Sequence, residues 1–68
     1  MKLSYDRKND SLYIRFQDAA VASSEDVADG VLVDLASNGE AVGIEVLGIA
    51  EWPERARRAI LKVSQPSS

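Results

Sequence analysis

The chain has 68 residues, 46% of them apolar, and contains no cysteine and no histidine. These absences exclude disulfides, thiolate metal sites and the commonest general base, and one domain of this size is expected to have a low net stability. The net charge of −3 is uneven, because residues 1–53 carry four basic and ten acidic side chains, giving −6, and residues 54–68 carry four basic and one acidic, giving +3. An acidic body argues against general nucleic-acid binding.

Membrane insertion and export are also not expected. No apolar run approaches the roughly 20 residues that span a bilayer. No charged and then apolar leader opens the sequence, and the missing cysteines suit a reducing compartment. We therefore expect a cytoplasmic protein with no membrane partner.

Two segments near the N-terminus alternate between apolar and polar residues. Residues 2–6 and 11–16 show a period of two, and the turn-forming residues 7–10 separate them, which predicts an antiparallel hairpin. A four-residue loop sets a register in which every large apolar side chain falls on the same side. The predicted apolar side is Leu3, Tyr5, Leu12, Ile14 and Phe16, with Tyr5 opposite Leu12 and Leu3 opposite Ile14, and the other side is Ser4, Tyr13 and Arg15.

The acidic residues Asp6 and Asp10 flank this predicted turn. Their carboxylates could bind calcium, or they could accept hydrogen bonds from the backbone of the turn itself. The spacing lacks the alternating ligands and the closing glutamate of an EF-hand. We therefore favour the role in turn formation.

Residues 20–28 show no clear alternation. They are compatible with a strand, or with a loop that holds a short strand near Val27. The dipeptide of Asp29 and Gly30 then indicates a turn into the aliphatic segment 31–36.

The dipeptide of Asn38 and Gly39 predicts a second hairpin with a two-residue type I′ turn. In that turn Ser37 pairs with Glu40, which fixes the register of the strands on either side. One face then carries the pairs Val31–Val46, Val33–Ile44 and Leu35–Val42, and the other carries Leu32–Glu45, Asp34–Gly43 and Ala36–Ala41.

Helical spacing replaces the strand pattern after Gly48. Pro53 and Glu54 suit the first turn of a helix, and we expect this helix to lie across the aliphatic face with Trp52 as its anchor. Its apolar side is predicted to hold Trp52, Ala56, Ala59, Ile60 and Val63. The basic residues could contact phosphate or an acidic partner, but we favour a solvated helix surface formed by Arg55, Arg57, Arg58 and Lys62, with Arg55, Arg58 and Lys62 together on the solvent side.

These elements predict an α+β fold: an antiparallel β-meander of four to five strands with one C-terminal α-helix packed on one face. Neither an internal repeat nor a linker is evident. We expect a single domain over residues 1–65 and a frayed tail over residues 66–68.

Several positions together form a recognisable signature. The first part comprises Tyr5, Asp6, Asp10, Leu12, Tyr13 and Ile14, and the second comprises Asp29, Gly30, Asp34, Gly39, Gly43, Ile44, Glu45, Val46 and Leu47. Over about residues 3–50 the chain thereby resembles a bacterial and archaeal family, Domain of Unknown Function 2283. The resemblance implies a compact strand-rich fold and no established activity. Genes of this family often lie beside small genes that look like toxins, which implies an antitoxin-like partner role by analogy.

Asp34 and Glu45 are diagonal neighbours on the second face of the predicted sheet, roughly 7 Å apart by strand geometry. They could hold a divalent cation or act as an acid/base pair. They could equally belong to a solvated sheet face whose acids pair with Arg15 or with lysines. We favour the solvated face, because two carboxylates without a third ligand or a cleft make a poor site. We expect no catalytic residue, no metal site and no cofactor.

The second face is too apolar for a purely solvated sheet, since it also carries Tyr13, Leu32 and Leu47. We therefore expect a non-enzymatic protein-interaction module, antitoxin-like by the resemblance, whose partner is a second copy or a small protein. The predicted interface residues are Tyr13, Arg15, Leu32, Asp34, Glu45 and Leu47. The alternative is a small metal-dependent or acid/base site at Asp34 and Glu45.

Overall fold

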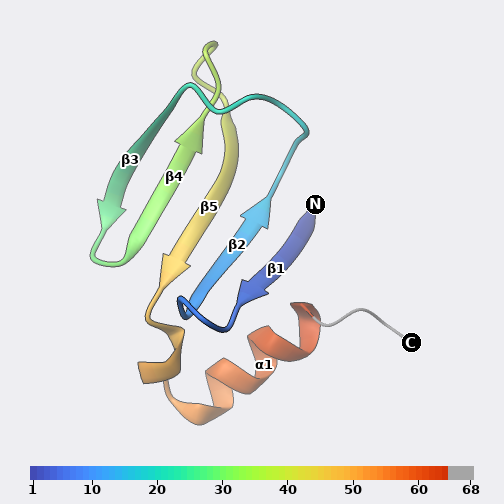
Figure 1. The fold of residues 1–68 in the computed structure, drawn as a ribbon, viewed down its shortest axis with the longest axis vertical. Coiled ribbons are helices and arrows are strands. Elements are labelled where there is room, and N and C mark those ends of the chain that lie inside the picture. The colour runs from blue at the N-terminus through green and yellow to red at the C-terminus, as the bar shows by residue number, and fades with distance from the viewer. Residues whose placement is uncertain (65–68) are drawn as a thin grey trace.

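The computed structural model describes residues 1–64 as a five-stranded antiparallel sheet followed by one α-helix (Figure 1). The predicted α+β fold class is confirmed. The predicted tail at residues 66–68 lies outside the described residues. In chain order the elements are β1 (Lys2–Asp6), β2 (Ser11–Arg15), β3 (Ser23–Ala28), β4 (Val31–Leu35), β5 (Ala41–Leu47), the short 3₁₀ helix η1 (Ile49–Glu51) and α1 (Glu54–Ser64).

The strand order across the sheet is β1-β2-β5-β4-β3. It departs from a simple meander because residues 16–22 carry the chain from β2 to the far edge, where β3 starts (Figure 1). The chain then returns through β4, and β5 fills the place beside β2. Residues 23–28, which the sequence left open between strand and loop, therefore form an edge strand.

The first hairpin has the predicted register, with Leu3 opposite Ile14 and Tyr5 opposite Leu12. Asp6 stabilises its turn, because Oδ1 of this residue accepts hydrogen bonds from the backbone N–H groups of Lys8 at 3.0 Å and Asn9 at 3.3 Å. Such bonds from an aspartate to its own turn are ordinary turn chemistry. The favoured role of Asp6 is thereby confirmed.

Asp10 connects the first hairpin to the segment after β5. Its backbone has a positive φ of 51°, and its carboxylate accepts hydrogen bonds from the Tyr5 hydroxyl at 3.0 Å and from the Ala50 N–H at 3.0 and 3.1 Å. Its carbonyl accepts the Gly48 N–H at 2.9 Å. One residue thus closes a turn and also holds η1 against the same end of the sheet.

The second hairpin turns differently from the type I′ prediction, which is wrong. A type I′ turn needs positive φ at both central residues, but of Asn38 and Gly39 only Gly39 has it, at 88°. The Gly39 N–H donates to the Ala36 carbonyl, and the Ala36 N–H donates to the Glu40 carbonyl, each at 2.9 Å. These bonds are typical of a three-residue hairpin loop, in which a turn is followed by a glycine in the left-handed backbone conformation.

The longer loop shifts the register at one point. Leu35 pairs with Ala41, and the pairing shift lies between Asp34 and Leu35, so the predicted pairs Leu35–Val42 and Ala36–Ala41 are wrong. Val42 is the extra residue of β5, which has no pairing partner on β4. It is fully buried, and its carbonyl accepts the N–H of Phe16 at 2.8 Å. The other predicted pairs are confirmed: Val31–Val46, Leu32–Glu45, Val33–Ile44 and Asp34–Gly43.

Residues that pair across strands lie on the same side of a sheet, so the register defines two faces. The aliphatic face carries the side chains of Leu3, Tyr5, Leu12, Ile14, Val31, Val33, Leu35, Ile44 and Val46. The second face carries Ser4, Tyr13, Arg15, Ser24, Leu32, Asp34, Glu45 and Leu47, with Gly43 between Arg15 and Asp34.

The helix packs at one end of the sheet and contacts β1 most (Figure 1). The hydrogen bond to Asp10 raises the pKa of the Tyr5 hydroxyl, and the nearby charge of Arg57 opposes that rise, which places Arg57 of α1 on the aliphatic side. The expectation that α1 would lie across the aliphatic face is therefore confirmed only at the β1 end. Trp52 is partly exposed, and the fully buried anchor of this region is Ile49.

The side of the helix that meets the sheet also differs from the prediction. Ala56 and Ala59 are exposed, and the partly buried residues of α1 are Arg57, Ile60 and Leu61. The side chain of Val63 lies outside the described part of the chain. The predicted solvent side of Arg55, Arg58 and Lys62 is confirmed, because all three are exposed.

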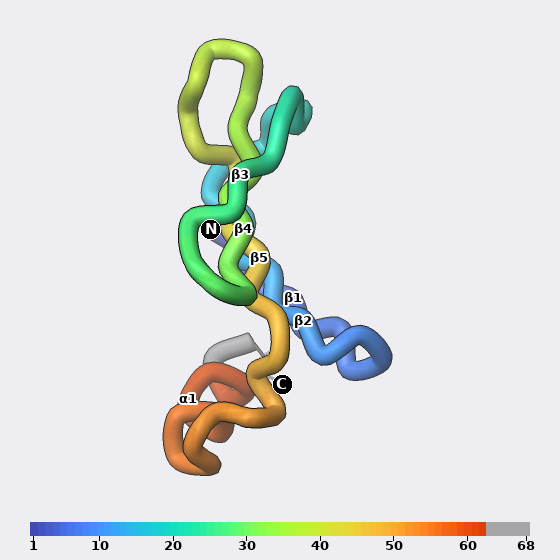
Figure 2. Tube along the Cα trace, turned by 90° about the vertical axis from the view of Figure 1, so that its left-hand side faces the viewer, coloured from blue at the N-terminus to red at the C-terminus, as the bar shows by residue number. Residues whose placement is uncertain are grey.

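Little of the aliphatic face is buried. Among residues 1–62, whose side chains the structure describes, the only buried hydrophobic side chains are those of Leu12, Val42 and Ile49. All five residues of β4 are partly exposed, so the two faces of this strand are not distinguished by burial. Figure 2, which views the sheet along its edge, shows one layer of strands with α1 below it. The molecule measures 36 × 31 × 18 Å.

We expect Asp10→Ala to lower the free energy of unfolding by about 1–3 kcal/mol, because it leaves the Ala50 N–H without its acceptor and puts alanine at a positive φ. Urea denaturation measures the change. Asp18→Ala is the control: the Asp18 carboxylate is fully exposed and lies 3.5 Å from Arg15, so its loss should change stability by less than about 0.5 kcal/mol. Equal effects of the two variants would contradict the role given to Asp10.

Candidate functional site

The six predicted interface residues lie on the second face of the sheet. Tyr13, Glu45 and Leu32 follow one another across β2, β5 and β4. In the next row Gly43 separates Arg15 from Asp34. Leu47 lies opposite Ser11 near the end of β5 and is 42% exposed. The register therefore brings all six to one surface, and their role as an interface stays a prediction.

A hydrogen-bonded group occupies the centre of this face. The Tyr13 hydroxyl donates to Oδ2 of Asp34 at 2.8 Å, and the Ser24 hydroxyl donates to Oδ1 at 2.5 Å. The three residues come from β2, β4 and β3, so these two bonds fasten strands on both sides of β5. Both carboxylate oxygens of Asp34 thus have protein partners.

Gly43 is what allows Tyr13 to reach Asp34. A Cβ atom at position 43 would lie 2.6 Å from Cζ of Tyr13 and 2.8 Å from the backbone oxygen of Ile14. Both distances are shorter than real carbon contacts allow, so no larger residue fits without movement of the ring and the backbone. The tyrosine ring therefore crosses β5 over the glycine and meets the carboxylate on the next strand.

The environment of Tyr13 changes its acidity. Burial raises the pKa of the Tyr13 hydroxyl above its usual value, and the hydrogen bond to Asp34 and the negative charge of that carboxylate raise it further. Each of these effects favours the neutral phenol, because a phenolate would be desolvated and placed beside a carboxylate. Tyr13 is thus held as a hydrogen-bond donor, which suits a structural bond and not a base.

The carboxylates on this face do not gather into a metal site. Within residues 1–64 no group of three acidic side chains is placed to hold an ion. Glu45 lies one row from Asp34, and the oxygens of Asp34 already accept two hydroxyl hydrogen bonds. The geometry supports a structural role for Asp34 better than an acid/base role.

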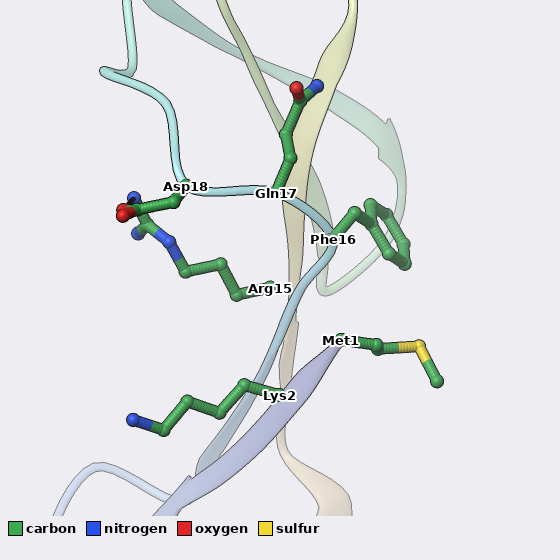
Figure 3. Close-up of a pocket in the computed structure, with 6 residues that line it drawn as sticks. All are labelled: Met1, Lys2, Arg15, Phe16, Gln17 and Asp18. Atoms are coloured by element: carbon green, nitrogen blue, oxygen red, sulfur yellow. Dashed lines mark ion pairs between the residues drawn. The ribbon is translucent and has the colours of Figure 1, made fainter.

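Arg15 takes part in a separate contact at the edge of the second face. Its guanidinium donates to the Ala19 carbonyl at 3.0 Å and lies 3.5 Å from the Asp18 carboxylate. In the described part of the chain neither Asp34 nor Glu45 forms an ion pair with it, contrary to one of our interpretations. Arg15 orders the loop that leaves β2, as Figure 3 shows by the position of Asp18.

Part of the aliphatic face is accessible to solvent. Figure 3 shows Met1 and Phe16 on one side of the sheet, opposite Lys2 and Arg15, so these two side chains extend the aliphatic face past the end of the strands. Phe16 is 40% exposed and Met1 is almost fully exposed. Val31, Val33 and Leu35 of β4, on the same face, are partly exposed as well.

The sequence analysis missed this surface, although a signal for it was present. A helix is about 10 Å across and strands lie about 4.8 Å apart, so one helix covers about two strands. Five strands with one helix therefore leave part of an apolar face open wherever the helix lies. We predicted that the uncovered surface is the second face, because we expected a single helix to cover the aliphatic face.

A comparison with protein families matches residues 2–49 to the model described as "Protein of unknown function (DUF2283)". The match covers all five strands and ends at the first residue of η1, so α1 lies outside it. No curated protein and no solved structure matches the chain. No helix within residues 1–64 is long and apolar enough to cross a membrane.

We expect Gly43→Ala to destabilise the protein by about 1–3 kcal/mol, because the new methyl group overlaps the Tyr13 ring and the Ile14 carbonyl. Thermal and urea unfolding measure the change. The same substitution in a Tyr13→Ala background should cost less, since the ring is then absent and only the backbone contact remains. Strictly additive effects of the two substitutions would contradict the contact between the ring and Gly43.

We also expect both tyrosines to ionise above the pH of free tyrosine. The hydrogen bond to Asp10 raises the pKa of Tyr5, and burial raises that of Tyr13. A raised pKa gives stability that is complete below the unfolded value near 10 and is lost as pH rises through the folded value. Absorbance at alkaline pH should therefore show late ionisation, and the Tyr13→Phe protein should lose less stability above about pH 10. Ionisation at the ordinary pH in the folded protein would refute this.

Proposed function

Because the chain belongs to the DUF2283 family of proteins of unknown function, we propose its function from the geometry of the sheet alone: it is a protein-interaction module without catalytic activity, and its docking surface is the aliphatic face. The observation that carries this proposal is the exposure of β4. Val31, Val33 and Leu35 point to the same side as the buried Leu12, yet each remains partly exposed.

The energetic argument concerns how much apolar surface the fold leaves in water. Fully burying one aliphatic side chain stabilises a protein by about 1.5–3 kcal/mol. Only three hydrophobic side chains within residues 1–62 are buried. A short chain has little stability to lose. A protein that covers the aliphatic face would therefore stabilise the fold as it binds.

The dimensions of the molecule are also suitable for binding a protein. Its broad side measures 36 × 31 Å, and a standard protein interface needs about 800 Å² from each partner. An apolar sheet face suits another sheet or helix better than a small molecule, which normally binds in a concave pocket.

The second face supports the proposal in a different way. Its central residues Tyr13 and Ser24 both donate hydrogen bonds to Asp34, so they hold the strands in register. The six residues first predicted as the interface can still contact a partner. The polar groups of Tyr13, Arg15 and Asp34 already have hydrogen-bond partners inside the chain, however, whereas Val31, Val33 and Leu35 are apolar and remain partly exposed.

The partner is expected to be a second copy or a small protein, as the sequence suggested. An antitoxin-like role is one form of this proposal, in which the covering surface belongs to a toxin-like protein. In either case binding should bury Phe16 and β4 and should not require a metal ion.

Matched substitutions on the two faces test which of them binds. Phe16 on the aliphatic face is 40% exposed, and Leu47 on the second face is 42% exposed. We expect Phe16→Glu to weaken association at least about 10-fold, because it places a charge in an apolar interface, and Leu47→Glu to weaken it less than about 3-fold. Sedimentation and titration with the partner measure the affinities, and circular dichroism confirms that both variants fold.

The opposite pattern would transfer the docking surface to the second face, as the sequence analysis first predicted. A protein that stays monomeric at high concentration and retains no affinity for the product of a neighbouring gene would refute the interaction function altogether.

A further inference from the structure

Four charged residues at the two sides of the sheet have no partner of opposite charge within residues 1–64. Glu25 pairs with Val33 in the register, so it lies on the aliphatic side of the edge strand β3, and Asp29 lies in the turn after it. Arg55 and Lys62 are exposed on α1. None of these four forms an ion pair within residues 1–64, where the recorded pairs are Arg15 with Asp18 and Arg58 with Glu54.

The acidic and basic groups lie at opposite sides of the same surface. Glu25 belongs to β3, at one edge of the sheet, Asp29 follows it in the turn to β4, and α1 contacts β1, at the other edge. Figure 1 shows that the turn between β3 and β4 lies at the same end of the sheet as α1. The aliphatic face therefore extends between an acidic edge and a cationic helix.

This arrangement is complementary to itself. A two-fold axis parallel to the strands exchanges the β1 side with the β3 side and keeps the α1 end in place. Two copies related by that axis bring each α1 to the β3–β4 turn of the other copy, where cations meet acids. An axis perpendicular to the strands would instead place each α1 at the far end, beside the loop at Asn38 and Gly39, away from Asp29.

We propose that the aliphatic face is covered by a second copy of this chain, packed sheet on sheet about a two-fold axis parallel to the strands. This inference rests on the proposed interaction function and adds the occupant and its orientation. The same apolar patch meets itself, as in the common symmetric dimers, with the two sheets about 10 Å apart. The broad side of 36 × 31 Å matches the roughly 800 Å² that each copy needs.

The orientation predicts that two differently charged variants bind each other. One carries Glu25→Lys with Asp29→Lys, and the other carries Arg55→Glu with Lys62→Glu. Each alone should form dimers at least about 10-fold more weakly than the unaltered chain, because both of its symmetric contacts then join like charges. In an equimolar mixture one contact has both charges exchanged and the other is unaltered, so heterodimers should form with nearly the original affinity.

A control separates this contact from general attraction between oppositely charged proteins. Asp18→Lys with Asp26→Lys changes the net charge by the same amount as the acidic-site variant, but Figure 3 places Asp18 beside Arg15, and Asp26 pairs with Leu32 on the second face. This control chain should dimerise normally and should not rescue the Arg55→Glu, Lys62→Glu chain. Sedimentation equilibrium, with one chain fluorescently labelled, measures every pair.

The inference is overturned if the unaltered chain is monomeric at high concentration, or if the mixture dimerises no better than its components. After either result, the proposed interaction function is still supported if a different protein binds the chain and Phe16→Glu abolishes that binding. A heterodimer that the control chain forms equally well also overturns the orientation, since net charge then accounts for it.

Discussion

An isolated helix of eleven residues cannot cover an apolar sheet face five strands wide, and the organisation of this molecule follows from that limit. The helix covers the β1 end of the aliphatic face, where Asp10 and Ile49 hold the neighbouring segment in place. The β4 side remains accessible. A single sheet layer gives water access to both faces, so the stability of the fold is limited by how much of this apolar surface is covered.

The hydrogen bonds on the second face stabilise the shape of the sheet and therefore of the aliphatic face. The ring of Tyr13 passes over Gly43 to reach Asp34, so its hydrogen bond joins β2 to β4 across β5. Such a bond resists twisting and slippage of β5, because a slip by one residue would turn Gly43 away from the ring. The side chain of Glu45 extends beside this group, which explains how a strand can carry a carboxylate at its centre without burying it.

Alternating residues allowed the local pairings to be predicted. The partners of Leu3, Tyr5, Val31 and Val33 are those that the sequence indicated, because one register alone gathers the apolar side chains. The predicted turn type at Gly39 was wrong because the dipeptide of Asn38 and Gly39 fits two hairpin loops of different length. The pairing of β2 with β5, and with it the bond between Tyr13 and Asp34, joins residues distant in the sequence, for which periodicity gives no information. Arg57 is partly buried in α1, and Ile49 is the buried residue of the segment before it. The helical spacing of apolar residues alone predicted other residues on the buried side.

The central place of β5 has a consequence for the order in which the chain can fold. The hairpin of β1 and β2 is complete by residue 15, but its inner neighbour is β5, which ends at Leu47. During synthesis the early hairpin therefore emerges with an unpaired strand edge and waits for about thirty further residues, a separation that slows folding in proteins rich in non-local contacts. The local β3, β4 and β5 pairings can assemble first and then accept the waiting hairpin. Until then, the unpaired edge of β2 is the part of the nascent chain most open to aggregation.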